Sequence, residues 1–232
     1  MRRLAVLSLH TSPLAQPGTG DSGGMNVYVR SLAGALARAG VDCDVYTRAW
    51  RKGLPPVESV EPGFRVHHVP AGPRRAAPVD QLRGVVDEFT AGVLGRLTGD
   101  DRPDLIHANY WLSGVAGHAL KHELSLPLVS TFHTLERVKA PVMEVGDAVR
   151  ARAEAEVIGC SDSIVASSAE EREQLQYLYE ADPERIEVVP PGVDHEIFSP
   201  GDRRAARLAL GLGDGPVLLF VGRIQRLKGV DV

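Results

Sequence analysis

The sequence predicts an α/β fold of the Rossmann-like type, in which helices cover both faces of a doubly wound parallel sheet. Short apolar runs rich in β-branched residues recur along the chain, and segments with apolar residues at helical spacing separate them. Strand and helix patterns that alternate in this way are typical of a parallel sheet. Strands are expected at residues 4–9, 44–47, 65–69, 104–108, 128–132, 163–167 and 185–189, and helices at 24–39, 79–97, 111–123, 145–159 and 169–179.

The first predicted strand leads into a long loop rich in glycine and proline, and an amphipathic helix follows it. Glycines let the backbone approach a ligand closely, and unpaired N–H groups at the start of a helix attract phosphate or carboxylate. Loops of this length inside compact domains are usually functional, although an ordinary flexible turn is the alternative. The glycines are Gly18, Gly20, Gly23 and Gly24, and the polar side chains are His10, Thr19, Asp21 and Asn26.

Polar and aromatic residues also follow other predicted strands. His10 follows the first strand, Asn109 and Tyr110 follow the fourth, and His133 and Thr134 follow the fifth. In an open α/β sheet, ligands bind outside the carboxyl ends of the strands. We therefore expect one crevice to collect these residues.

The composition is that of a globular protein, with 44% hydrophobic residues, 24% charged residues and a formal net charge of −4. This balance argues against a general nucleic-acid or membrane binder. No run approaches the roughly 18 apolar residues of a membrane span, and the basic start lacks the features of a secretory signal. The two cysteines, Cys43 and Cys160, show neither metal-ligand spacing nor a disulfide framework, so we predict no metal site and a cytoplasmic location.

The last part of the chain has a different pattern. Pro190 and Pro191 end the seventh strand, and a short connecting helix is expected at 202–210. Residues 217–221 look like one more buried strand, with its loop at 222–229. Because a lone strand cannot satisfy its backbone, we expect a domain at 1–195 and, at 196–232, a linker and the start of an incomplete second domain.

Five ordered blocks of the chain resemble the retaining GT-B glycosyltransferases of family four. They are HTSPLAQPGTGDSGGMNVYV at residues 10–29, YWLSG at 110–114, TFHTLERVK at 131–139, VPPGVD at 189–194 and GRIQRLKG at 222–229. Five blocks in order are far more specific than a lone glycine motif. They look most like the branch that glycosylates inositol 3-phosphate in mycothiol biosynthesis, and several are similar in sucrose-phosphate synthases.

The resemblance implies two Rossmann-like domains facing a cleft, with the acceptor on the first and the nucleotide sugar mainly on the second. It implies transfer with retention and without a covalent enzyme intermediate, so that the protein stabilises a leaving diphosphate and an oxocarbenium-like centre. The implied substrates are UDP-N-acetylglucosamine and 1D-myo-inositol 3-phosphate. It leaves open a Mg²⁺ ion held by the second domain and a homodimer, and it implies no other cofactor.

The resemblance also assigns roles to individual residues. His133 matches a catalytic histidine beside the donor sugar. The matching donor contacts are Gln16, Pro17, Gly24, Arg223 and Lys228. The matching acceptor contacts are His10, Asp21, Ser22, Gly23, Gly24, Met25 and Asn26, with Tyr110, Thr134 and Arg150 as a clamp for the acceptor phosphate. For Arg150 the alternative is a plain surface ion pair with Glu154, since the two lie one helical turn apart.

The sequence departs from this pattern at Val79, where the family has a fourth clamp residue, a lysine. We expect Arg74 or Arg75 to replace it, because either can chelate a phosphate. Another acceptor, such as a hexose phosphate or a lipid-linked sugar, stays open, as does a non-catalytic sugar-phosphate-binding domain. An NAD-dependent dehydrogenase fits less well, because Thr47 and Arg48 end the second strand where an acidic residue would bind ribose.

Overall fold

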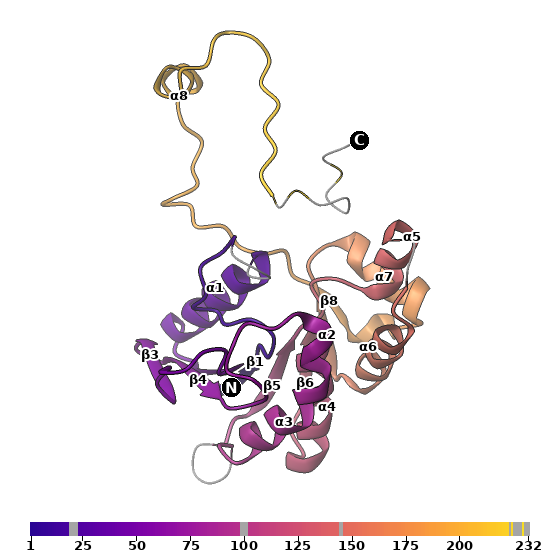
Figure 1. The fold of residues 1–232 in the computed structure, drawn as a ribbon. Helices are drawn as coiled ribbons and strands as arrows, with labels where there is room; N and C mark the ends of the chain where they lie inside the picture. Colours follow the sequence, from indigo (N-terminus) through magenta and orange to yellow (C-terminus); the bar gives the residue numbers. More distant parts are fainter. Residues whose placement is uncertain (19–22, 98–101, 144–145, 223, 225–228, 230–232) are drawn as a thin grey trace. The chain divides into compact units, whose positions relative to one another are not determined.

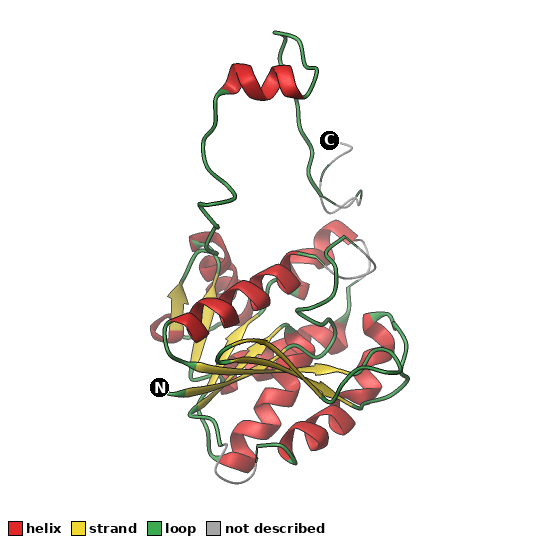
Figure 2. Ribbon diagram, turned by 90° about the vertical axis from the view of Figure 1, so that its left-hand side faces the viewer, coloured by secondary structure: helices red, strands yellow, loops and turns green. Residues whose placement is uncertain are grey.

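The computed structural model describes residues 1–18, 23–97, 102–143, 146–222, 224 and 229. The chain divides into two units, Met1–Val189 and Pro190–Val232. The first unit holds one eight-stranded sheet with the order β3-β4-β2-β1-β5-β6-β7-β8, and helices cover both of its faces (Figures 1 and 2). Its strands are β1 (Arg3–Leu7), β2 (Asp42–Arg48), β3 (Val57–Glu61), β4 (Phe64–Val69), β5 (Leu105–Asn109), β6 (Leu128–Thr131), β7 (Ser163–Ala166) and β8 (Ile186–Val188).

The helices of the first unit connect these strands. They are α1 (Gly24–Arg38), α2 (Val79–Leu82), the 3₁₀ turn η1 (Arg83–Val85), α3 (Val86–Leu94), α4 (Trp111–Leu124), α5 (Glu136–Met143), α6 (Ala148–Cys160), α7 (Ala169–Tyr179) and the 3₁₀ turn η2 (Pro183–Arg185). The predicted α/β fold of the Rossmann-like type is therefore confirmed. All seven strand positions predicted for this unit contain a strand, with shifts of at most two residues at the ends.

The central strand β1 shows why the sheet is buried on both faces. Leu4 and Val6 point into one hydrophobic cluster, while Ala5 and Leu7 point into another. Successive side chains of a strand face opposite sides, so a continuous apolar run suits a strand covered by helices on both sides. β1 pairs in parallel with β2 on one side and with β5 on the other. The chain order reverses here, and such a switch point is where open α/β sheets bind ligands.

Three elements were not predicted from the sequence, namely β3, α5 and the short turn η2. β3 is an exposed edge strand that pairs antiparallel with β4, so the sheet is mostly rather than wholly parallel. Gly63, with φ of 79°, makes the tight turn between them. The helix α5 was missed because it is short and contains Pro141, which usually interrupts a helix.

Three predicted elements differ in the structure. The single helix expected at 79–97 is divided into α2, η1 and α3, since Val85 lies outside helical geometry. The helix expected from residue 145 begins at Ala148, because the Asp147 side chain caps it by accepting from Arg150 N. The strand expected at 217–221 was wrong for the described chain, because no strand in the described residues pairs with this segment.

The second unit, taken by itself, contains the helix α8 (Arg203–Ala209). The Asp202 side chain caps it and accepts a hydrogen bond of 2.6 Å from Ala205 N. This helix confirms the connecting helix predicted at 202–210. The two-domain organisation itself stays a prediction.

Candidate active site

The carboxyl ends of three neighbouring strands bring the predicted site residues together. β1 pairs with β5 and β5 pairs with β6, so the residues after these strands lie along one edge of the sheet. The His10 and Tyr110 rings lie 4.3 Å apart, and His133 Nε2 lies 3.0 Å from Asn109 Oδ1. The strand-end side chains predicted to line one crevice are therefore in direct contact in two pairs, His10 with Tyr110 and Asn109 with His133.

Two of these residues have unusual backbone geometry. Tyr110 has φ of 75° and ψ of 154°, a region that side chains rarely adopt, and His133 has φ of 61°. Such conformations cost about 1–3 kcal/mol each and cluster at functional sites. The structure holds Tyr110 in place through its N–H, which donates to Thr131 O at 2.8 Å, and its carbonyl, which accepts from Gly114 N at 2.9 Å.

His133 is held as a neutral imidazole. Burial, with the nearby His107 and His10, lowers the pKa of His133 to about 3. Because Asn109 Oδ1 can only accept, His133 Nε2 carries the proton and donates, which leaves Nδ1 as an acceptor. The Tyr28 ring packs edge-on against the imidazole, with the two ring centres 5.0 Å apart. At neutral pH His133 can therefore accept a hydrogen bond from a hydroxyl group, but it cannot act as an acid.

Several buried polar atoms beside the crevice have no hydrogen-bond partner among the described residues. They include His10 Nδ1, Asn109 Nδ2 and Trp111 Nε1. Burial, followed by the positive charges of Arg150 and Lys139, lowers the pKa of His10 to about 4, so this ring is neutral too. Most buried polar atoms in proteins are paired. A group of unpaired ones around a strained tyrosine is what a polar ligand would satisfy.

Arg150 is the centre of a buried ionic network and not a surface ion pair. Its side chain is 7% exposed and that of Glu154 is 0% exposed. Arg150 Nε donates to Glu154 Oε1 at 2.7 Å, and Nη2 donates to Thr134 O at 2.8 Å and to Thr134 Oγ1 at 3.1 Å. The guanidinium also lies 5.1 Å from the centre of the Tyr110 ring. Arg150 therefore contacts both of the other predicted clamp residues, Thr134 and Tyr110.

The loosest contact of Arg150 is the one that a ligand could replace. Its Nη1 lies 3.4 Å from Glu136 Oε2, which is beyond a good charge-assisted hydrogen bond. Glu136 is anchored separately, because its Oε1 accepts from Asp147 N at 2.8 Å. An anion could therefore bind Nη1 without breaking the hydrogen bonds of Asp147 at the start of α6.

Arg83 is a second cation in this region, and the sequence reasoning did not single it out. Its guanidinium pairs with Asp147, whose Oδ1 also accepts from Arg150 N at 3.0 Å. It also lies 5.3 Å from the centre of the Trp111 ring. Arg83 comes four residues after Val79, a spacing that could have drawn attention to it.

Val79, which stands where the family has the clamp lysine, lies in apolar surroundings. Val79 packs against the hydrophobic cluster that includes Trp111. Arg74 and Arg75 are exposed, and the buried Arg48 donates to the carbonyls of Pro73 and Arg75. Arg48 therefore orders the loop that carries both arginines. Whether either one reaches a phosphate stays a prediction.

The predicted residues at the start of α1 divide into anchors and open positions. Asn26 is buried, its Oδ1 accepts from Gly23 N at 3.1 Å, and its amide donates to Ser12 O, so it ties the loop to the helix. Met25 packs against a core cluster, whereas Gln16 and Pro17 are exposed. Asp21, Ser22, Arg223 and Lys228 lie outside the described residues, as do Thr19 and Gly20.

Gly24 has open space where a side chain would lie. A Cβ placed there meets no described atom within 4 Å, so packing within the described chain does not require glycine at this position. Gly24 is the first residue of α1, where backbone N–H groups are free to bind an anion. Glycine at this position would allow a ligand to approach the backbone closely.

Comparisons with known proteins identify the family of the chain. The chain matches the family described as Glycosyltransferase Family 4 over residues 22–197. It is 49% identical over its whole length to D-inositol 3-phosphate glycosyltransferase from Actinosynnema mirum, of which it covers 57%. It is also 49% identical, over 99% of its length, to the protein of the same name from Xylanimonas cellulosilytica, of which it covers 58%.

Solved structures show the same relationship. Sucrose-phosphate synthase from Thermosynechococcus elongatus superimposes with a TM-score of 0.90 at 31% identity, and the match covers 100% of this chain and 58% of that one. Anabaena HepE in complex with UDP and glucose shares the fold, with a TM-score of 0.57 at 17% identity over 91% of this chain and 50% of that one. This chain therefore spans just over half the length of the relatives it matches.

The sheet, the family match and these neighbours define the class of the first unit, which is a Rossmann-like domain of a GT-B glycosyltransferase. The chain belongs to Glycosyltransferase Family 4. In the part of the chain that the structure describes, no helix is both long and apolar enough to cross a membrane.

Proposed function

We propose that this chain supplies the acceptor crevice and part of the donor site of a retaining glycosyltransferase. The proposed reaction moves N-acetylglucosamine from its UDP derivative to 1D-myo-inositol 3-phosphate. The names of the relatives from Actinosynnema and Xylanimonas support this acceptor. The observation that carries the proposal is the contact of Arg150 with both Thr134 and Tyr110, beside unpaired buried polar atoms.

The acceptor phosphate is proposed to bind at Arg150 and Arg83. Arg150 presents Nη1, whose present neighbour Glu136 is 3.4 Å away, and Thr134 and Tyr110 supply hydroxyl groups. Arg83 shares the carboxylate of Asp147 with the end of the helix that carries Arg150. Two guanidinium groups can bind a phosphate through several charge-assisted hydrogen bonds. In this proposal Arg83 binds the acceptor phosphate in place of the family's lysine, whose position Val79 occupies.

The donor diphosphate is proposed to approach Gly24 at the start of α1. The helix N-terminus and the open space at Gly24 favour a close phosphate contact. Arg223 and Lys228 would bind the same diphosphate, as the family resemblance implies. Their positive charges would stabilise the transition state more than the ground state, because the leaving diphosphate gains negative charge there.

His133 is proposed to orient the donor sugar. Its unprotonated Nδ1 can accept from a sugar hydroxyl while Asn109 holds Nε2. A fixed hydroxyl limits the rotation of the ring and favours a reactive pose. In this proposal His133 does not act as a nucleophile. The acceptor attacks the front face of the donor sugar, and no covalent enzyme intermediate forms. We place the reaction in the cytoplasm, where cysteines such as the unpaired Cys43 and Cys160 remain reduced.

Binding calorimetry with inositol 3-phosphate and unphosphorylated inositol tests the proposal. We expect measurable binding of the phosphorylated compound and a loss of at least about tenfold for the neutral one, since one charge-assisted hydrogen bond is worth about 1.5–3 kcal/mol. Arg150→Gln should remove most of this preference. Equal affinity for the two compounds would exclude the clamp and favour a neutral or lipid-linked acceptor. Binding without sugar transfer by the complete protein would support a non-catalytic domain instead.

A further inference from the structure

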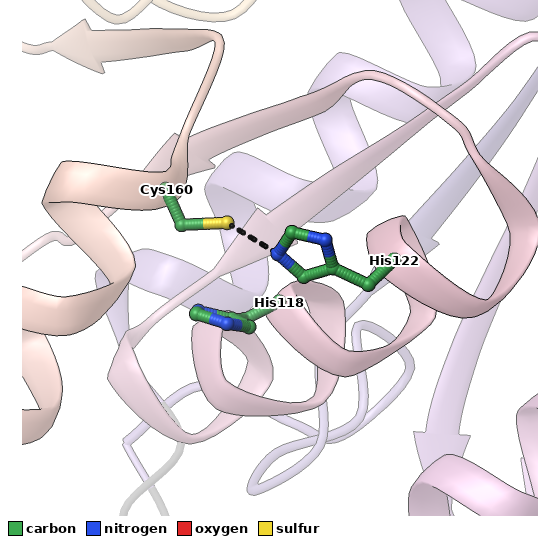
Figure 3. A group of neighbouring side chains, drawn as sticks. All are labelled: His118, His122 and Cys160. Atoms are coloured by element: carbon green, nitrogen blue, oxygen red, sulfur yellow. Dashed lines mark hydrogen bonds between the residues drawn. The ribbon is translucent and has the colours of Figure 1, made fainter.

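The helices α4 and α6 pack along a seam that continues beyond the crevice. A series of positions four residues apart faces α6. It begins at Tyr110, the residue before α4, whose ring lies beside Arg150, and it continues along α4. One turn later, a Cβ added at Gly114 would lie 2.8 Å from Val157 Cγ1, so the two helices approach very closely there. The next positions in this series are His118 and His122. Cys160 ends α6 opposite them (Figure 3).

The three side chains gather at one point. His118 Nδ1 or Nε2, a ring nitrogen of His122 and Cys160 Sγ all lie within 4.8 Å of one another. Cys160 Sγ lies 3.3 Å from His122 Nε2, and the two imidazole ring centres are 5.0 Å apart (Figure 3). A simple thiol–imidazole hydrogen bond would account for His122 and Cys160, but it would not place His118 beside them.

We propose that His118, His122 and Cys160 form a Zn²⁺ site. Tetrahedral zinc with bonds of about 2.0–2.1 Å to nitrogen and about 2.3 Å to sulfur needs ligand atoms about 3.3–3.6 Å apart. The 3.3 Å contact of Cys160 with His122 is already in this range, and the upper bound of 4.8 Å for the cluster requires only small side-chain rotations. Thiolate and imidazole ligands suit zinc better than magnesium or calcium.

Two charged side chains lie near the cluster. Glu156 supplies a negative charge near His118, and Lys121 supplies a positive one. Glu156 lies one turn before Cys160 on α6 and pairs with Arg152. Three protein ligands leave one position, which water or Glu156 can fill.

The zinc site would join the far ends of the two helices that build the crevice. Ten residues separate Arg150 from Cys160, which corresponds to about 15 Å along a helix. Lys121 Nζ also donates to Cys160 O at 2.8 Å and to Asp162 Oδ2 at 2.7 Å, so this end of the seam is ordered without metal. The metal would therefore act as a structural link between α4 and α6, remote from the reacting groups.

Titration of the purified, tag-free protein with zinc, by calorimetry and by competition with a chromophoric chelator, tests this proposal. We expect one Zn²⁺ per chain and a rise in Tm on binding. His118→Ala and Cys160→Ser should each weaken binding by at least about 30-fold, because each removes one of three ligands. Cobalt substitution should show a thiolate charge-transfer band that is absent in Cys160→Ser.

His195→Ala is the matched control, since His195 is exposed and lies outside the cluster. It should bind zinc as the unchanged protein does. Absence of stoichiometric zinc binding, or unchanged affinity in His118→Ala, would overturn the site. Both variants alter partly exposed side chains, so circular dichroism should confirm that they fold.

Discussion

Replacement of Arg83 by alanine tests the acceptor site most sharply, because this residue was found only in the structure. If Arg83 binds the acceptor phosphate, the change removes at least one charge-assisted hydrogen bond, worth about 1.5–3 kcal/mol. Since 1.4 kcal/mol is a factor of ten, the affinity for inositol 3-phosphate should fall by about 10- to 150-fold. The affinity for unphosphorylated inositol should barely change.

The structural cost of this change should be small. The Arg83 and Asp147 side chains are 33% and 29% exposed, and a partly exposed ion pair contributes only about 0–1 kcal/mol. Asp147 keeps its other task, because it still accepts from Arg150 N. Thermal unfolding should therefore shift little, which separates loss of binding from loss of fold.

Calorimetric titration of four proteins with both compounds measures the effect. The unchanged chain, Arg83→Ala, Arg74→Ala and Arg75→Ala should be compared, because Arg74 and Arg75 are the exposed alternatives on the neighbouring loop. An equal loss for the phosphorylated and neutral compounds would show that Arg83 acts only through Asp147. A selective loss in Arg74→Ala or Arg75→Ala, with Arg83→Ala unchanged, would refute the assignment and support the alternative drawn from the sequence.

Three other predictions follow from the site and the core. Gly24→Val should leave Tm within a few degrees, because a Cβ there meets no described atom within 4 Å, but it should lower donor affinity measurably in a UDP-sugar titration; unchanged affinity would contradict the phosphate contact. In the complete protein, Arg223→Ala or Lys228→Ala should lower kcat at saturating donor, whereas a rise in KM alone would mean that the charges act before the transition state. Asp44→Asn should destabilise the fold near neutral pH. Burial acts to raise the pKa of Asp44, but hydrogen bonds from Arg65 and His67 outweigh it and hold the pKa well below its usual range. That stabilisation is present above the unfolded pKa of about 3.9 and is lost as the pH falls below it. The difference in unfolding free energy between the two proteins should therefore shrink below about pH 4, and a constant difference would show that charge is not the cause.

The sequence was sufficient for most of the order of elements and for the edge of the sheet at which the site is proposed. A period of two or of 3.6 in apolar residues is a local property, so strands such as β1 and helices such as α1 and α7 could be predicted from the chain alone. Polar residues after strands, such as His10 and His133, then indicated the carboxyl edge, since parallel strands end together. β3 and α5 escaped because an exposed edge strand and a short helix with Pro141 carry weak local patterns.

Only the tertiary structure decided which charges and ligands meet. Arg150 and Glu154 have the spacing of an exposed pair, yet both are buried because α5 and Tyr179 cover them. Arg83 joins Asp147 across 64 residues, and Cys160 meets His122 across 38. Such pairs depend on how helices pack on a shared sheet, and no local period records them. Sequence therefore determined the fold class and the edge at which we propose that substrate binds. The packing of α5, α6 and α7 determined the buried network, and the packing of α4 on α6 determined the proposed zinc site.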